Sequence, residues 1–242
     1  ALKHVPLVEA NPVEGVRTNI LGTVNLADAC AQAAVPVVVV ISTDKAVNPS
    51  SVMGATKRVA ERYCQALDLD ADVATRFVTV RFGNVLGSTG SVVPLFQKQL
   101  ARGGPLTVTH PDMKRYFMTV REAVELVLQA SAAGAVDAEM AGKIFVLDMG
   151  EPVRIVDLAR QMIKLAGLQP DVDIAIEITG PRPGEKLFEE VFHGGEALVS
   201  ARQKGLLLAA PRAGDRGELK DAAEELSKAC DADDLTTIMA RI

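Results

Sequence analysis

The chain has 242 residues, of which 48% are hydrophobic and 24% are charged, and its formal net charge is −5 at pH 7. This length can bury one sizeable core, and the acidic balance argues against nucleic acid as a partner, because a surface that follows phosphates needs an excess of basic residues. No run of about 18 apolar residues and no signal-peptide pattern occurs, so we expect this segment neither to insert into a membrane nor to carry an export signal.

Helical and strand patterns alternate along much of the chain. Three helix-then-strand units are predicted: 13–34 with 37–41, 54–67 with 77–82, and 121–133 with 144–147. The run 37–41 is β-branched throughout, which is typical of a strand buried on both faces of a parallel sheet. The alternation predicts an α/β fold with a partial Rossmann-like parallel sheet.

The segments outside these units predict a smaller lobe. Short strands are expected at 106–109 and 174–178, with a helix over 155–166. From about residue 214 the sequence is rich in Asp, Glu, Lys and Ala, which predicts a solvated terminal helix. We therefore assign residues 1–90 and 120–150 to the sheet domain, and residues 91–119 and 151–242 to a smaller C-terminal lobe and tail.

The segment 42–57 carries the strongest signal of chemistry. Ser42, Thr43, Asp44 and Lys45 follow the strand 37–41, and ligands bind beyond the carboxyl ends of parallel strands. An adjacent carboxyl and amine could serve as the acid and base of a water elimination, which acts on two different atoms. The alternative is that they only cap the turn at 48–50.

Several further strings extend this pattern: STDKA from Ser42, GATK from Gly54, RFGNVLGS from Arg81, HPDMKRYFMT from His110 and RPGEK from Arg182. Together they resemble the UDP-N-acetylglucosamine 4,6-dehydratases of the polysaccharide-biosynthesis group, within the extended short-chain dehydrogenase/reductases. The resemblance extends from about residue 1 to about residue 192. It implies a lyase that binds a UDP-sugar, uses NAD or NADP as cofactor, and forms homo-oligomers.

The resemblance also implies the course of the reaction. Oxidation at carbon 4 of the sugar would precede loss of water across carbons 5 and 6, and hydride would then return to carbon 6. Lys45 would remove the proton on carbon 5, and Asp44 would protonate the hydroxyl that leaves carbon 6. Lys57 would reach the nicotinamide ribose of the cofactor.

Met53 departs from the family pattern. Dehydrogenases of this superfamily carry Tyr-x-x-x-Lys on the helix after the catalytic strand, and here Met53 precedes Lys57 by four residues. A thioether cannot accept the proton of the sugar 4-hydroxyl. We expect Thr43, with Ser42 as second choice, or a water polarised by Lys57 to take that role. The alternative is that Met53 is a core residue and redox activity is lost.

The resemblance assigns the remaining polar residues to ligands. Arg115 and Arg182 would hold the UDP diphosphate, since guanidinium groups match phosphate oxygens in bidentate geometry; each could instead be a surface arginine. Other residues are expected near the nucleotide sugar or the cofactor: Asn84 and Lys3 at the sugar, Glu185 at the uridine ribose, and Ser42 and Asn19 on the cofactor side.

A strand, Gly-rich turn and helix that would hold the cofactor pyrophosphate do not occur in the sequence. We therefore interpret the sequence as the C-terminal part of a larger enzyme, and expect the isolated chain to be inactive and the strand 37–41 to be an outer strand. Rival interpretations are an epimerase or reductase of the same fold and a non-catalytic UDP-sugar-binding fragment.

The three cysteines lie far apart in sequence and form no metal-binding spacing. They predict reduced thiols and no metal site. This pattern favours a protein in the cytoplasm, or at the cytoplasmic face of a membrane if membrane helices lie upstream of this segment.

Overall fold

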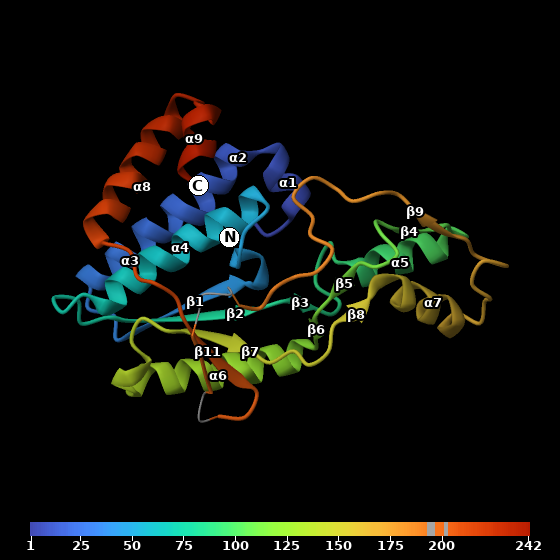
Figure 1. Cartoon of the computed structure of the whole chain (residues 1–242), viewed down its shortest axis with the longest axis horizontal. Coiled ribbons are helices and arrows are strands. Elements are labelled where there is room, and N and C mark those ends of the chain that lie inside the picture. Colours follow the sequence, from blue (N-terminus) through green and yellow to red (C-terminus); the bar gives the residue numbers. More distant parts are fainter. Residues whose placement is uncertain (193–196, 201–202) are drawn as a thin grey trace.

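A sheet flanked by helices on both faces forms the centre of the computed structural model, which describes residues 1–192, 197–200 and 203–242 (Figure 1). The strand order is β1-β2-β7-β11-β10. The bounds of these strands are β1 Val37–Thr43, β2 Arg76–Phe82, β7 Ile144–Leu147, β11 Leu206–Ala210 and β10 Ala197–Ser200. The strands β1, β2 and β7 run parallel, whereas β11 is antiparallel to both of its neighbours. The predicted α/β class and its parallel sheet are confirmed.

Most helices cover one face of the sheet. Their bounds are α1 Val5–Ala10, α2 Pro12–Val16, the π-helical η1 Arg17–Leu21, α3 Gly22–Gln32, α4 Val52–Leu69, α8 Arg216–Asp231 and α9 Leu235–Arg241. The apolar core on this face joins Ile20, Val40, Leu67 and Phe77. On the opposite face, α6 (Val120–Val136) packs against β2 and β7 through residues such as Ala130 and Phe145. The two cores fix the sheet between its helices.

The C-terminal tail differs from the prediction. Residues from 197 onward were assigned to the lobe, but β11 pairs with β7 and therefore extends the main sheet. The terminal helix is not fully solvated either, because α8 buries Ala223, Leu226 and Ala229 in the same core as Leu67 of α4. These small and apolar residues recur at helical spacing among the charges, and they give α8 one buried face.

The smaller lobe lies to one side of the sheet (Figure 1). Its elements are α5 Val92–Ala101, β4 Leu106–Val108, α7 Ile155–Leu165 and β9 Ile176–Ile178. The strands β4 and β9 pair in parallel, and Phe96, Leu106 and Ile163 form a separate apolar core. Both predicted strands and the predicted helix of the lobe are confirmed.

Four short strands lie between the sheet and the lobe in the chain: β3 Asn84–Val85, β5 Lys114–Arg115, β6 Phe117–Met118 and β8 Val153–Arg154. Two 3₁₀ turns belong to the sheet domain: η2 Asp44–Ala46 follows β1, and η3 Ala138–Met140 follows α6. β3 pairs with β6, and β5 pairs with β8. These ladders bring Asn84 and Arg115 toward the carboxyl ends of the main strands.

The strand β1 lies at an edge of the described sheet, as predicted. Its Val39 and Ile41 are 37% and 45% exposed, although both are large apolar residues. Within the residues that the structure describes, none of the helices combines the length and the apolarity that crossing a bilayer requires.

Candidate active site

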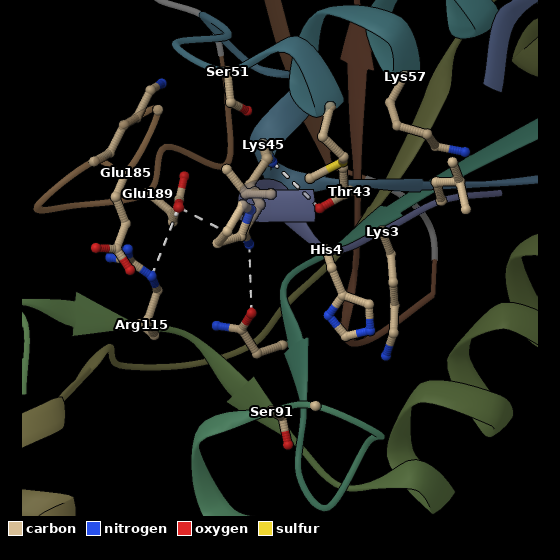
Figure 2. A pocket seen from close by; sticks show the side chains of 18 of the residues that line it. Lys3, His4, Thr43, Lys45, Ser51, Lys57, Ser91, Arg115, Glu185 and Glu189 are labelled. Atoms are coloured by element: carbon tan, nitrogen blue, oxygen red, sulfur yellow. Dashed lines mark hydrogen bonds and ion pairs between the residues drawn. The ribbon is translucent and has the colours of Figure 1, made fainter. Parts of the chain in front are cut away.

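A cavity of about 520 Å³ opens at the carboxyl ends of β1 and β2. Its walls come from the segment 1–6, the end of β1, the start of α4, the loop 88–91 and the segment 182–190. We call the segment 182–190 the strap, because it runs from the lobe back over the end of β1. Figure 2 shows Lys45 in this cavity, with Glu189 and Arg115 on one side and Lys3 and His4 on the other.

The turn after β1 places an acid and an amine in direct contact. The Thr43 hydroxyl accepts from the Lys45 backbone N–H at 3.4 Å and donates to Asp44 Oδ1 at 2.8 Å. The Asp44 side chain is fully buried, and its Oδ1 also accepts from Lys45 Nζ at 2.9 Å. Lys45 Nζ donates further to Asn84 Oδ1 at 3.4 Å, so the lysine is held from two strand ends.

The other carboxylate oxygen, Asp44 Oδ2, is buried and has no hydrogen-bond partner among the described residues. It faces Gly83, where an added Cβ would lie 2.9 Å from it and 2.9 Å from Met149 Sδ. Gly83 therefore leaves the room that the carboxylate occupies. A buried carboxylate oxygen without a partner costs free energy, which is a common feature of groups used in chemistry.

The helix α4 begins directly beneath this turn. Ser51 caps the helix by accepting from the Gly54 backbone N–H at 3.1 Å. Gly54 is required there because a Cβ would collide with the backbone carbonyl of Lys45. Gly54, the first residue of the GATK string, thus allows α4 to pack closely against the turn.

Met53 and Lys57 both line the cavity, as their four-residue spacing predicts. Lys57 Nζ donates to the Ile41 carbonyl of β1 at 2.7 Å, and burial lowers the pKa of Lys57 from its ordinary value against the attraction of Glu61. Met53 is only 3% exposed and also packs against Val8, so it is at once a core residue and a wall of the cavity.

The two hydroxyls at the end of β1 differ in their partners. The Thr43 hydroxyl is engaged with Asp44, whereas the Ser42 hydroxyl is buried and has no partner within the described part of the chain. Ser42 also lines the cavity. Of the two residues considered for the missing tyrosine, Ser42 has the uncommitted oxygen.

A buried ion pair fixes α4 against the sheet one turn beyond Lys57. Arg81 and Glu61 are each 1% exposed, and two hydrogen bonds of 2.8 and 2.7 Å join the guanidinium to the carboxylate. Such a bidentate pair sets both distance and orientation. Arg81, the first residue of the RFGN string, thus supports the site without lining it.

The strap is tied to the turn that precedes α4. Lys186 Nζ donates to the Val47 carbonyl at 3.0 Å, the Ser50 hydroxyl donates to the Gly184 carbonyl at 3.3 Å, and Asn48 Nδ2 donates to Glu190 Oε2 at 2.8 Å. These bonds hold the strap against the cavity.

The strap delivers a residue that the sequence analysis missed. Glu189 Oε1 lies 3.9 Å from Lys45 Nζ and 3.7 Å from Arg115 Nε, and its side chain is 4% exposed. Burial is the largest cause that raises the pKa of Glu189 above its ordinary value. Its position three residues after the RPGEK string was the only signal, and nothing local distinguishes it from the exposed Glu190 beside it.

The predicted ligand residues separate into two groups. Lys3, Asn84, Arg115, Arg182 and Glu185 all line the cavity. Asn19 does not; instead it is buried and bonds both backbone groups of Leu2 and the Thr56 hydroxyl, so it positions the segment that carries Lys3.

Four of the predicted residues also border a second hollow of about 200 Å³ toward the lobe: Asn84, Arg115, Arg182 and Glu185. The two hollows therefore adjoin at these side chains. Arg115 is 8% exposed, whereas Arg182 is exposed and its backbone N–H donates to Glu185 Oε2 at 3.1 Å. A bound molecule could thus extend from Lys45 into the lobe.

The arrangement can move protons between an amine and carboxylates at the bottom of a cavity, and it offers guanidinium groups to an anion. Among the described residues, no cluster of His, Cys, Asp and Glu has the geometry of a metal site.

Comparison with known proteins places these features in a family. The family model described as "Polysaccharide biosynthesis protein" matches residues 1–210. The capsular polysaccharide biosynthesis protein CapD of Staphylococcus aureus is 58% identical over 81% of this chain and 32% of its own length. A Campylobacter jejuni protein named UDP-N-acetylglucosamine 4,6-dehydratase (inverting) is 37% identical over 78% of this chain and 53% of its own length.

A solved structure shares the fold. MoeE5, in complex with UDP-glucuronic acid and NAD, superposes with a TM-score of 0.63 at 26% identity, over 76% of this chain and 65% of MoeE5. The chain thus spans about a third to two thirds of the proteins it matches.

Proposed function

The chain belongs to the polysaccharide biosynthesis protein family, and from this membership and the cavity we propose that it carries the dehydration site of an NAD(P)-dependent nucleotide-sugar 4,6-dehydratase that acts on a UDP-sugar of the UDP-N-acetylglucosamine class. The observation that carries the proposal is the Asp44–Lys45 pair at the end of β1, joined at 2.9 Å, in which Lys45 lines the cavity and the buried Asp44 contacts it. An epimerase or reductase of the same fold would have no step for this pair.

The Asp44–Lys45 pair can carry the proton that the elimination transfers from carbon 5 to the departing hydroxyl. Lys45, as a neutral amine, removes the proton on carbon 5, while the carbon–oxygen bond at carbon 6 breaks and its electrons leave with the hydroxyl. The proton passes from Lys45 to Asp44 Oδ1 along their hydrogen bond and then to the departing hydroxyl, which leaves as water.

The residues on the other side of Lys45 fit the ribose end of a nicotinamide cofactor. Lys57 and the uncommitted Ser42 hydroxyl would hold the nicotinamide ribose, and bound NAD(P)+ would supply oxidation at carbon 4 and the hydride that returns to carbon 6. The lowered pKa of Lys57 means that its ammonium is held there at a desolvation cost, which a ribose hydroxyl would relieve by replacing or joining the Ile41 carbonyl.

The substrate would extend from the sugar at Lys45 to the uridine in the lobe. Arg115 stands between the two hollows and would bind the diphosphate, with Arg182 at its exposed edge. Lys3 and Asn84 would contact the sugar, and Glu185 the uridine ribose.

We also infer a homo-oligomer. The exposed apolar residues of β1 and a row on α6, including Val124 and Leu128, which are 51% and 64% exposed, support association. Light scattering of the full-length product of the gene tests this inference, and a monodisperse monomer would contradict it.

The decisive experiment is turnover of UDP-N-acetylglucosamine by the full-length product of the gene. Lys45→Ala should lower formation of the 4-keto-6-deoxy sugar by about 10²–10⁴-fold, the usual cost of losing a general base. Lys98→Ala, at an exposed lysine of α5, is the matched control and should keep normal turnover. Near-normal turnover by Lys45→Ala would end the assignment, and a 4-epimer as the sole product of the wild type would favour the epimerase.

A further inference from the structure

Lys45 has a carboxylate on each side, although a general base must be a neutral amine. Its Nζ lies 2.9 Å from Asp44 Oδ1 and 3.9 Å from Glu189 Oε1. Either carboxylate is therefore placed to accept a proton from Nζ, and the elimination needs one of them to do so before Lys45 can act as a base.

Glu189 has the surroundings for that role. The charged groups that face it are Lys45 and Asp44 from the turn, Arg115 from β5 and Lys186 from the strap. The carboxylate is nearly fully buried, which disfavours its charged form, and the cations around it act in the opposite direction. Any event that weakens one of these cations shifts Glu189 toward its neutral acid.

Arg115 is the cation that a substrate would engage. Its Nη1 donates to the carbonyls of Lys114 and Leu187 at 2.8 and 3.3 Å, and its Nε faces Glu189 at 3.7 Å. A diphosphate bound to the Arg115 guanidinium would compensate its positive charge and would place a negative charge beside Glu189. Both changes favour a neutral carboxyl at Glu189.

We propose that Glu189 takes a proton from Lys45 when a nucleoside diphosphate group binds Arg115, and that this transfer generates the neutral amine that starts the elimination. One N–H bond of the ammonium breaks and one O–H bond forms on Glu189, so an ion pair becomes a neutral pair without a change in total charge. Glu189 does not contact the reacting atoms of the sugar. It acts only through Lys45, whose proton it accepts, and is therefore a positioning residue. The proposal rests on the proposed function and explains why catalysis would begin only with substrate in place.

The strap gives this arrangement its geometry. Two hydrogen bonds hold the strap at the two ends of the turn 47–50. Lys186 donates to the Val47 carbonyl, and Ser50 donates to the Gly184 carbonyl. Glu189 is thereby kept between Lys45 and Arg115, as Figure 2 shows.

The first test measures UDP binding by calorimetry, without turnover. Glu189→Gln should bind UDP about 3- to 10-fold more tightly than the wild type, because a like charge beside the diphosphate is removed. Glu224→Gln, at an exposed carboxylate of α8 far from the strap in the sequence, is the matched control and should stay within about twofold. Weaker binding by Glu189→Gln would overturn the proposal, since a residue that supports structure or contacts the substrate would have that effect.

The second test follows kcat against pH in the full-length product. Glu189→Gln should lower kcat about 10²-fold near pH 7, as loss of a proton acceptor does, and kcat should recover toward pH 10 because hydroxide then removes the proton from Lys45. A kcat deficit that is equal at every pH would overturn the proton transfer. Absence of any 4-keto product from the wild type would refute the proposed function instead, and the UDP measurement would still decide whether Glu189 opposes the diphosphate at Arg115.

Discussion

The turn after β1 and the strap meet in one cavity, but the contacts that hold them differ in kind. In the turn, the contacts join neighbours in sequence, such as Thr43 with Asp44 and Ser51 with Gly54. The contacts of the strap join residues about 140 positions apart, such as Lys186 with the Val47 carbonyl. The groups proposed to react are therefore local, whereas the charges proposed to control them come from a distant segment of the chain.

After the loss expected for Lys45→Ala, the largest effect should come from removing Lys57, which follows the turn on α4. In the full-length product, Lys57→Ala should lower turnover by about 10²–10³-fold, the usual cost of removing one preorganised electrostatic donor. Met53→Leu should stay within about 1.5 kcal/mol of the wild type in both barrier and stability, because the swap conserves volume. Steady-state kinetics and thermal unfolding of the two variants measure the contrast. Equally severe kinetic losses would mean that the Met53 thioether has a chemical role.

A smaller effect is expected where the strap and the lobe meet. Arg115→Ala should weaken UDP binding by about 1.5–3 kcal/mol, since it removes hydrogen bonds to a charged group. Arg182→Ala should cost less, about 0–1 kcal/mol, because its exposed guanidinium is screened by water. Calorimetry on both variants gives the order of the two arginines. Unchanged affinity in both would place the diphosphate elsewhere.

The smallest expected effects are changes in the free energy of unfolding at two neighbouring serines, Ser51 and Ser50. Ser51 caps α4 within the local region, so Ser51→Ala should lower the free energy of unfolding by about 1 kcal/mol. Ser50 bonds the strap at 3.3 Å from an exposed position, and Ser50→Ala should change the free energy of unfolding by about 0.5 kcal/mol or less. Urea unfolding followed by circular dichroism compares the variants. A larger loss from Ser50→Ala would show that the strap contributes more to stability than the helix cap.

The sequence alone determined the parts of the molecule that depend on short-range patterns. The β-branched run 37–41 and the four-residue spacing of Met53 and Lys57 depend on strand propensity and on the helical period, which a local segment specifies. The Asp44–Lys45 pair was predictable for the same reason, since adjacent residues at a strand end remain adjacent in the fold. Its catalytic role, and those of the ligand residues, remain predictions.

Only the tertiary structure decided the surroundings of that pair. Glu189 and Glu190 look alike in sequence, but the path of the strap buries the first between Lys45 and Arg115 and leaves the second exposed. The return of β11 to the main sheet and the placement of Asn19 behind Leu2 were likewise beyond local patterns. Burial and charge contacts depend on which distant segments pack together, and the free energy of that packing is a property of the whole chain, which no short window of sequence contains.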